Sequence, residues 1–174
     1  VAYTVYDLLI GEATMDQVLC KEAIENLDVI PANIDLSGAE IELLDTENKE
    51  YILRDEVLKI RSNYDYVIID CPPSLSMLTI NSMTTADTVL VPIQCEYYAL
   101  EGLSQLIKTI ELVKERLNEN LEMEGVVFTM YDARTNLSLQ VVENVKDNLD
   151  QTIYKTIIPR NIRLAEAPSH GLPI

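Results

Sequence analysis

An aspartate at the end of an apolar run is the residue best placed for metal chemistry. Asp70 directly follows residues 66–69, which read YVII. A central strand with this pattern carries an acid to the edge of a sheet, where the carboxylate holds a hydrated Mg²⁺ beside bound phosphates. Pro72 and Pro73 impose a stiff, extended exit that could sense a γ-phosphate. Taken alone, the pattern also fits a helix cap or a turn.

The other half of a phosphate site is absent from the sequence. A phosphate-binding loop needs glycines that let backbone N–H groups approach the phosphates, followed by a Gly-Lys-Ser/Thr run. None of the five glycines precedes a lysine, and no G-x-G-x-x-G occurs. The single histidine, His170, is not accompanied by a G-x-S-x-G motif, so serine-hydrolase chemistry is unsupported.

The elements that must position such residues alternate along the chain. Apolar runs rich in Val and Ile predict strands at 27–32, 66–70, 88–93, 125–130 and 153–159. Amphipathic stretches predict helices at 37–46, 48–62, 76–84, 101–118 and 136–149. Ser37 and Glu40 form the pattern of a capping box. The alternation predicts an α/β fold, with a doubly wound, mostly parallel sheet and helices on both faces.

Ligands of such sheets bind beyond the carboxyl ends of the strands. Polar side chains follow four of the predicted strands, at 70–74, 94–98, 131–135 and 160–161. No linker rich in Gly, Ser or Pro divides the chain, so we expect one domain over residues 1–174.

Charge is unevenly distributed. The chain has 29 acidic and 13 basic residues and a net charge of -16, which by itself argues against a nucleic-acid partner. Residues 126–174 are nevertheless neutral and hold three of the six arginines, Arg134, Arg160 and Arg163. An anionic partner would therefore dock there.

Several classes are excluded by composition. No run approaches the roughly 18 apolar residues that a membrane span requires, and the first residues lack the basic region of a secretory signal. We therefore expect a cytoplasmic protein without a membrane partner. The three cysteines, Cys20, Cys71 and Cys95, form no C-x-x-C pair, which favours reduced, buried thiols over a disulfide framework or a zinc site.

Four stretches, in this order, resemble the ParA/MinD family of deviant-Walker ATPases. They read YDYVIIDCPPSL, PIQCEYYALEGLSQL, TMYDARTNLSLQVVE and YKTIIPRNIRLAEAPSHG. The resemblance covers residues 6–174 and is closest to the chromosome-partitioning ParA (Soj) branch. It implies an ATP hydrolase of the P-loop NTPase type, with ATP and Mg²⁺ as cofactors, that partitions a chromosome or plasmid.

The resemblance also implies roles for individual residues. Asp70 matches the acid that holds Mg²⁺ through water, and Pro72 lies in a nucleotide-responsive switch over 71–75. Four residues match segments that wall the adenine pocket: Met130, Pro159, Arg160 and Asn161. Three lie where the partner subunit of an ATP-dependent homodimer approaches: Gln94, Glu96 and Tyr97. Two match arginines that bind DNA without sequence preference: Arg134 and Arg163.

In the mechanism that the resemblance implies, the ATP-bound dimer binds DNA on the nucleoid, and a ParB-like partner stimulates hydrolysis and release. Family members open with a strand and a KGGxGKT loop that this sequence lacks, so we expect an internal fragment, without the N-terminal P-loop and the C-terminal helix. Two alternatives stay open. One is a non-catalytic DNA-binding or dimerisation module without a P-loop. The other is a MinD-like division-site ATPase, which needs a C-terminal amphipathic membrane helix.

Overall fold

The computed structural model describes residues 2–72, 74, 76–96 and 99–171. The chain forms two compact units, Val1–Ala86 and Asp87–Ile174.

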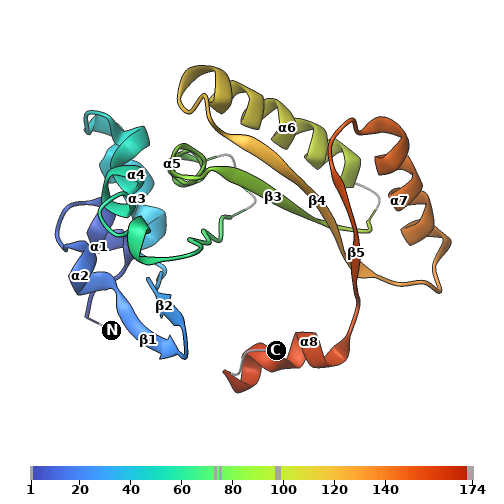
Figure 1. Cartoon of the computed structure of the whole chain (residues 1–174), viewed down its shortest axis with the longest axis horizontal. Coiled ribbons are helices and arrows are strands. Elements are labelled where there is room, and N and C mark those ends of the chain that lie inside the picture. Colours follow the sequence, from blue (N-terminus) through green and yellow to red (C-terminus); the bar gives the residue numbers. More distant parts are fainter. Residues whose placement is uncertain (1, 73, 75, 97–98, 172–174) are drawn as a thin grey trace. The chain divides into compact units, whose positions relative to one another are not determined.

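The second unit contains a parallel sheet with the strand order β3-β4-β5 (Figure 1). Its elements, in chain order, are β3 (Thr88–Gln94), α6 (Ala99–Arg116), β4 (Glu122–Tyr131), α7 (Asn136–Asn148), β5 (Ile153–Pro159), α8 (Ile162–Glu166) and a 3₁₀ turn, η4 (Ala167–His170). α6 joins β3 to β4, and α7 joins β4 to β5. Both connections step in the same direction across the sheet, and right-handed crossovers then place both helices on the same face.

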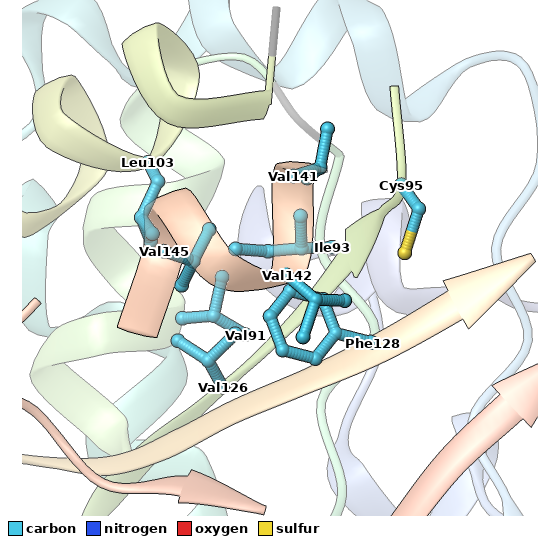
Figure 2. Close-up of a cluster of buried hydrophobic side chains, with 9 residues drawn as sticks. All are labelled: Val91, Ile93, Cys95, Leu103, Val126, Phe128, Val141, Val142 and Val145. Carbon is cyan, nitrogen blue, oxygen red and sulfur yellow. The ribbon is translucent and has the colours of Figure 1, made fainter. Parts of the chain in front are cut away.

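The core of this unit lies between that face and the two helices (Figure 2). The register of the β3–β4 pair sets Val91 opposite Val126 and Ile93 opposite Phe128. Because side chains alternate between the faces of a strand, all four point to the helix side. The buried cluster comprises Val91, Ile93, Cys95, Leu103, Val126, Phe128, Val141, Val142 and Val145.

The first unit is mostly helical and carries a short antiparallel hairpin. Its elements are α1 (Val5–Leu9), α2 (Met15–Val18), β1 (Cys20–Ile24), β2 (Leu27–Val29), α3 (Leu36–Glu42), α4 (Ile52–Val57) and α5 (Met77–Thr85), with 3₁₀ turns η1 (Leu43–Asp45), η2 (Lys49–Tyr51) and η3 (Arg61–Asn63). Leu8 and Leu9 of α1, Met15 and Val18 of α2 and Leu53 of α4 are members of its buried core.

Asn81 of α5 is only 1% exposed and hydrogen-bonds to backbone groups of α4, η2 and α5. Its Oδ1 accepts a hydrogen bond from the N–H of Leu53 (3.2 Å), in the first turn of α4. Its Nδ2 donates to the carbonyl oxygens of Lys49 (2.7 Å) and Met77 (3.1 Å). No side chain of its own caps α4, so Asn81 satisfies one of the donors that every helix start leaves free.

The α/β class with a parallel sheet is confirmed. The strands expected at 88–93, 125–130 and 153–159 are β3, β4 and β5, and the helices expected at 76–84, 101–118 and 136–149 are α5, α6 and α7.

The strand expected at 66–70 is wrong. A strand requires backbone pairing, and among the described residues none forms a ladder with this segment. Tyr66 and Ile68 are 86% and 92% exposed, whereas Ile69 packs against the core of the first unit. The strand expected at 27–32 is also shorter, ending at Val29, and it pairs with β1 in an antiparallel hairpin.

Two expectations about helices are wrong. The helix expected at 48–62 breaks into η2, α4 and η3, because Tyr51 (φ -115°, ψ 0°) and Ile60 (φ -120°, ψ -18°) leave the helical region. The capping box of Ser37 with Glu40 does not form. Asp35 is the N-cap of α3, and the Ser37 hydroxyl donates to the carbonyl oxygen of Ile34 (2.8 Å).

The expectation of buried thiols is right for one cysteine. Cys95 is buried, Cys20 is half-buried and Cys71 is exposed, and all three are free. Burial raises the pKa of the Cys95 thiol.

Candidate functional site

The carboxyl ends of β4 and β5 form one edge of the sheet. Tyr131 is paired with Pro159, and the N–H of Arg160 donates to the carbonyl oxygen of Tyr131 (2.9 Å). This pairing brings Met130 and Tyr131 beside Pro159 and Arg160. Three of the four residues assigned to the adenine pocket, Met130, Pro159 and Arg160, are therefore neighbours along one edge. Their role towards a nucleotide stays a prediction.

Met130 interrupts the regular strand. Its φ of +53° is in the left-handed region, which residues other than glycine rarely adopt. The β4–β5 register shifts between Phe128 and Tyr131, as a bulge would produce. The Met130 side chain is 40% exposed. The bulge thus turns an apolar side chain outward, just before the polar loop that follows β4.

β3 ends at the same edge of the sheet, because Gln94 pairs with Thr129 of β4. Gln94 and Glu96 are exposed, whereas Cys95 between them is buried in the core. The N–H of Glu96 donates to the carbonyl oxygen of Gln94 (2.8 Å), which tightens the chain at this point. Tyr97, the third residue expected at a dimer interface, lies outside the described residues.

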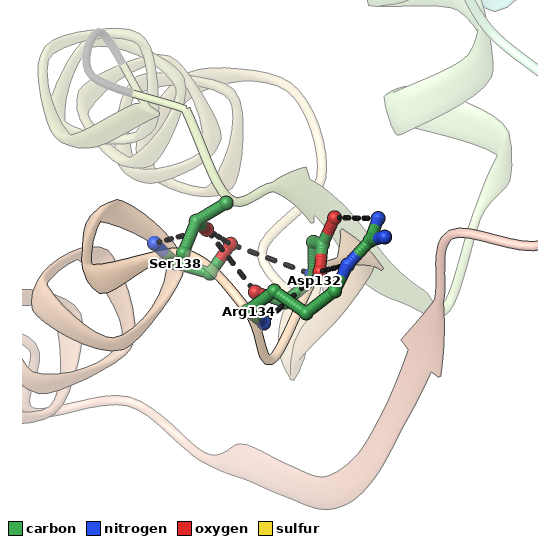
Figure 3. A network of polar contacts seen from close by, with 4 residues as sticks. Asp132, Arg134 and Ser138 are labelled. Carbon is green, nitrogen blue, oxygen red and sulfur yellow. Dashed lines mark hydrogen bonds and ion pairs between the residues drawn. The ribbon is translucent and has the colours of Figure 1, made fainter.

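The loop after β4 carries a two-bonded ion pair (Figure 3). The Arg134 guanidinium donates from Nε to Oδ1 of Asp132 (2.9 Å) and from Nη2 to Oδ2 (2.7 Å). The backbone N–H of Arg134 also donates to Oδ1 (3.0 Å). These hydrogen bonds, with a smaller effect of the charges of Arg134 and Arg160, hold the pKa of the Asp132 carboxyl well below its usual range. Asp132 is therefore an anion at any pH near neutrality.

Thr135 fixes this loop onto the start of α7. Its hydroxyl oxygen accepts a hydrogen bond from the N–H of Ser138 (3.3 Å), as an N-cap does, and donates to the carbonyl oxygen of Asp132 (3.1 Å). Ser138 is buried, and its hydroxyl accepts a weak bond from the N–H of Asp132 (3.4 Å). The helix cap thus determines where the ion pair lies.

Arg163 lies in α8, the short helix that follows β5. Asn161 is the N-cap of α8, and its Oδ1 accepts a hydrogen bond from the N–H of Arg163 (2.8 Å). Arg134, Arg160 and Arg163 are all exposed. The Asn161 side chain, assigned to the nucleotide on resemblance, serves the backbone here.

Asp70 and Pro72 belong to the first unit, and both are exposed. Of the switch segment 71–75, the structure describes 71, 72 and 74, which have no regular secondary structure. Among the described residues, no three His, Cys, Asp or Glu side chains gather into a possible metal site. Asp70 presents an exposed carboxylate, and its role towards Mg²⁺ stays a prediction. Over the same described positions, no helix is long and apolar enough to cross a membrane.

The sequence predicted a polar segment over 131–135 but gave no individual role to Asp132 or Thr135, and it did not single out Ser138. The signal was present in the sequence: an acid two residues before Arg134, and a threonine, a preferred N-cap residue, directly before the predicted helix at 136–149.

Comparison with known proteins defines the class. The chain has the fold of a cobyrinic acid a,c-diamide synthase from Mycobacterium smegmatis, solved with bound ADP and magnesium. The TM-score is 0.85 at 39% identity, and the match covers 92% of this chain and 65% of that one. The parallel α/β sheet and this likeness define a P-loop NTPase-like fold.

A family model described as an AAA domain matches residues 1–123. The sporulation initiation inhibitor protein Soj of Bacillus subtilis is 56% identical over 170 residues, which is 98% of this chain and 67% of that protein. The chromosome partitioning protein ParA of Caulobacter vibrioides is 54% identical over 173 residues, 98% of this chain and 65% of the relative. The chain belongs to the ParA/Soj family of chromosome-partitioning ATPases. It spans about two-thirds of the length of these relatives.

Proposed function

We propose that this chain is part of a ParA-type partitioning ATPase that binds DNA without sequence preference through the edge formed by β4 and β5. In the complete protein, ATP and Mg²⁺ promote a homodimer that binds DNA on the nucleoid. A ParB-like partner stimulates hydrolysis, and the dimer then releases DNA. Asp70 contributes to the magnesium site, together with phosphate-binding residues that this chain does not supply.

One observation carries the DNA proposal. Arg134 follows the end of β4 and Arg160 follows the end of β5, and the N–H of Arg160 donates to the carbonyl oxygen of Tyr131, the last residue of β4 (2.9 Å). Arg163 follows in α8. All three side chains are exposed, within the neutral third of a chain whose net charge is -16. Arginine is well suited to phosphate oxygens, and binding through phosphates needs no base contacts.

The names of the relatives support partitioning over synthesis. Identity is 56% to Soj and 39% to the cobyrinic acid a,c-diamide synthase. A synthase would not require arginines exposed at this edge to contact a polyanion. DNA binding therefore separates the two readings.

The test is the DNA affinity of the complete gene product with ATP and Mg²⁺. Replacing both Arg134 and Arg163 by Ala is expected to weaken binding about tenfold or more at moderate salt, and to reduce the slope of log K against log salt by up to about two. The matched control replaces Arg116 and Lys146 by Ala. These residues are exposed near the carboxyl ends of α6 and α7, close to the amino ends of the strands, and carry the same total charge.

The control pair should change binding much less than the edge pair. Equal loss in both double variants would mean that only net charge matters, and the edge assignment would be wrong. No loss in either would exclude DNA as the ligand of this surface.

A further inference from the structure

The edge of a guanidinium that forms two parallel hydrogen bonds is the same edge that a phosphate takes. In Arg134 this edge, with Nε and Nη2, is already occupied by the two carboxylate oxygens of Asp132. The Arg134 side chain is 87% exposed, so solvent and ligands reach it freely, whereas the Asp132 side chain is 21% exposed. A phosphate can approach the arginine, but it meets a bound carboxylate there.

The carboxylate cannot easily move aside. Asp132 lies in a loop that is fixed by the Thr135 hydroxyl on its carbonyl oxygen and by the Arg134 N–H on its own Oδ1. The long, exposed Arg134 side chain is the mobile partner of the pair. On binding DNA, Arg134 must therefore either break its hydrogen bonds to Asp132 or leave the Asp132 carboxylate close to the DNA phosphates.

We propose that Asp132 restrains DNA binding at this edge, because its carboxylate competes with DNA phosphate for the guanidinium of Arg134. Asp132 is a positioning residue: it holds Arg134 in a defined place and keeps the affinity of the edge low enough for release. The inference rests on the proposed DNA-binding function and adds a control element to it.

The test is Asp132→Asn in the complete gene product with ATP and Mg²⁺. Asparagine keeps the size of the side chain and removes its charge. We expect DNA affinity to rise about two- to fivefold, the scale of an exposed ion pair, and the salt slope to steepen by up to about one as Arg134 gains a phosphate contact. Asp132→Glu keeps the charge and should stay close to the parent protein.

The matched control is Glu143→Gln, which removes one negative charge from an exposed position on α7. Any general effect of net charge appears in this variant. The specific effect is the excess gain of Asp132→Asn over Glu143→Gln. That excess should vanish when each substitution is made separately in an Arg134→Ala protein, because there is then no guanidinium for Asp132 to hold.

The outcomes separate this inference from the proposed function. If Arg134→Ala weakens DNA binding but Asp132→Asn gains no more than Glu143→Gln, DNA binding stands and the restraint is wrong. A gain that persists undiminished in the Arg134→Ala background, or an equal gain in Asp132→Glu, also overturns the restraint. If Arg134→Ala leaves the affinity unchanged, the role proposed for Arg134 and the restraint both fail.

Discussion

Gly125 of β4 lies against the backbone of Thr152, just before β5, so closely that a Cβ on this glycine would come within 2.8 Å of the Thr152 carbonyl oxygen. The φ of Gly125 is +152°, a value that side-chain-bearing residues rarely adopt. The next residue, Val126, donates its N–H to the same oxygen (2.9 Å). The glycine thus lets β5 start directly beside β4. From here the β4–β5 register shifts twice, between Val126 and Phe128 and again between Phe128 and Tyr131, before the Tyr131–Pro159 pair at the candidate site.

Gly125→Ala is expected to destabilise the protein. The added methyl group would meet backbone at 2.8 Å and the Tyr154 ring at 3.1 Å, in a conformation that alanine disfavours. We expect a loss of about 1–3 kcal/mol in the free energy of unfolding, measured by urea denaturation.

The matched control is Gly102→Ala. Gly102 lies inside α6, and apart from its chain neighbours and the adjacent helix backbone a Cβ there would meet nothing within 4 Å. Alanine should stabilise the helix by about 0.5–1 kcal/mol. A Gly125→Ala protein as stable as the parent would show that β4 and β5 tolerate a wider separation than the structure has.

We expect the buried amide of Asn81 to contribute to the free energy of unfolding. In Asn81→Leu, the N–H of buried Leu53 and the carbonyl oxygen of half-buried Lys49 lose their side-chain partner. Burying unpaired polar groups is costly, so we expect a loss of about 2–4 kcal/mol.

Asn148→Leu is the control for Asn81. The Asn148 side chain is exposed and donates to the carbonyl oxygen of Asn144 (2.8 Å), so its loss should change the unfolding free energy by no more than about 0.5 kcal/mol. Equal effects of the two substitutions would contradict the structural role of Asn81.

The sequence predicted the second unit better than the first, for a physical reason. β3, β4 and β5 are apolar runs that each find a ladder partner, and β3 and β4 also contribute to the core beneath the helices. Segment 66–70 has the same composition, but no described strand pairs with it. The pattern of apolar side chains indicates which residues favour burial. A strand also needs a neighbouring backbone to pair with, and the composition of the segment does not show whether one is present.

The sequence predicted where in the fold the candidate site lies, but not which side chains bond to each other within it. Fold topology places the ends of parallel strands at one edge, so Arg134 and Arg160 were correctly expected at strand ends. The pairing of Asp132 with Arg134 depends on the turn that the Thr135 cap imposes. Polar residues two apart in a loop have no fixed relation until such a turn is known.

A hydrogen bond between α1 and α3 predicts a pH dependence at alkaline pH. The Tyr6 hydroxyl donates to Oε1 of Glu42 (2.7 Å). This bond, with some desolvation and the negative charge of Glu42, raises the pKa of Tyr6 to about 12. Since the folded state favours the protonated phenol, the contribution is fully present below the ordinary tyrosine pKa of 10.0 and is lost as the pH rises through about 12.

Tyr6→Phe should therefore lower the thermal unfolding midpoint at pH 7 and at pH 9, with a smaller difference at higher pH. A difference titration of tyrosine absorbance between parent and variant should show one phenol ionising near pH 12. Tyr3→Phe, which removes the hydroxyl of a nearby exposed tyrosine, is the control for the midpoint. A Tyr6 phenol that titrates near pH 10 would show that the bond to Glu42 does not persist in solution.

Asn161 links a helix cap to the arginine that follows it. Its Oδ1 accepts the N–H of Arg163 (2.8 Å) and opens α8, a helix of only five residues. Such a short helix is marginal without its cap, which is worth about 1 kcal/mol. Asn161→Ala should therefore speed amide exchange over residues 163–166. It should also weaken DNA binding about two- to fivefold, because Arg163 must then be ordered on binding.

Asn161→Ser separates the cap from the amide group, since serine also caps helices but lacks the amide. If the cap is what matters, the serine protein keeps slow exchange and parental DNA affinity. If Asn161 instead contacts the nucleotide, as the family resemblance implies, serine should lower nucleotide affinity while leaving exchange in α8 unchanged. Measuring both quantities in both variants decides between the two roles, because only the cap connects Asn161 to the position of Arg163.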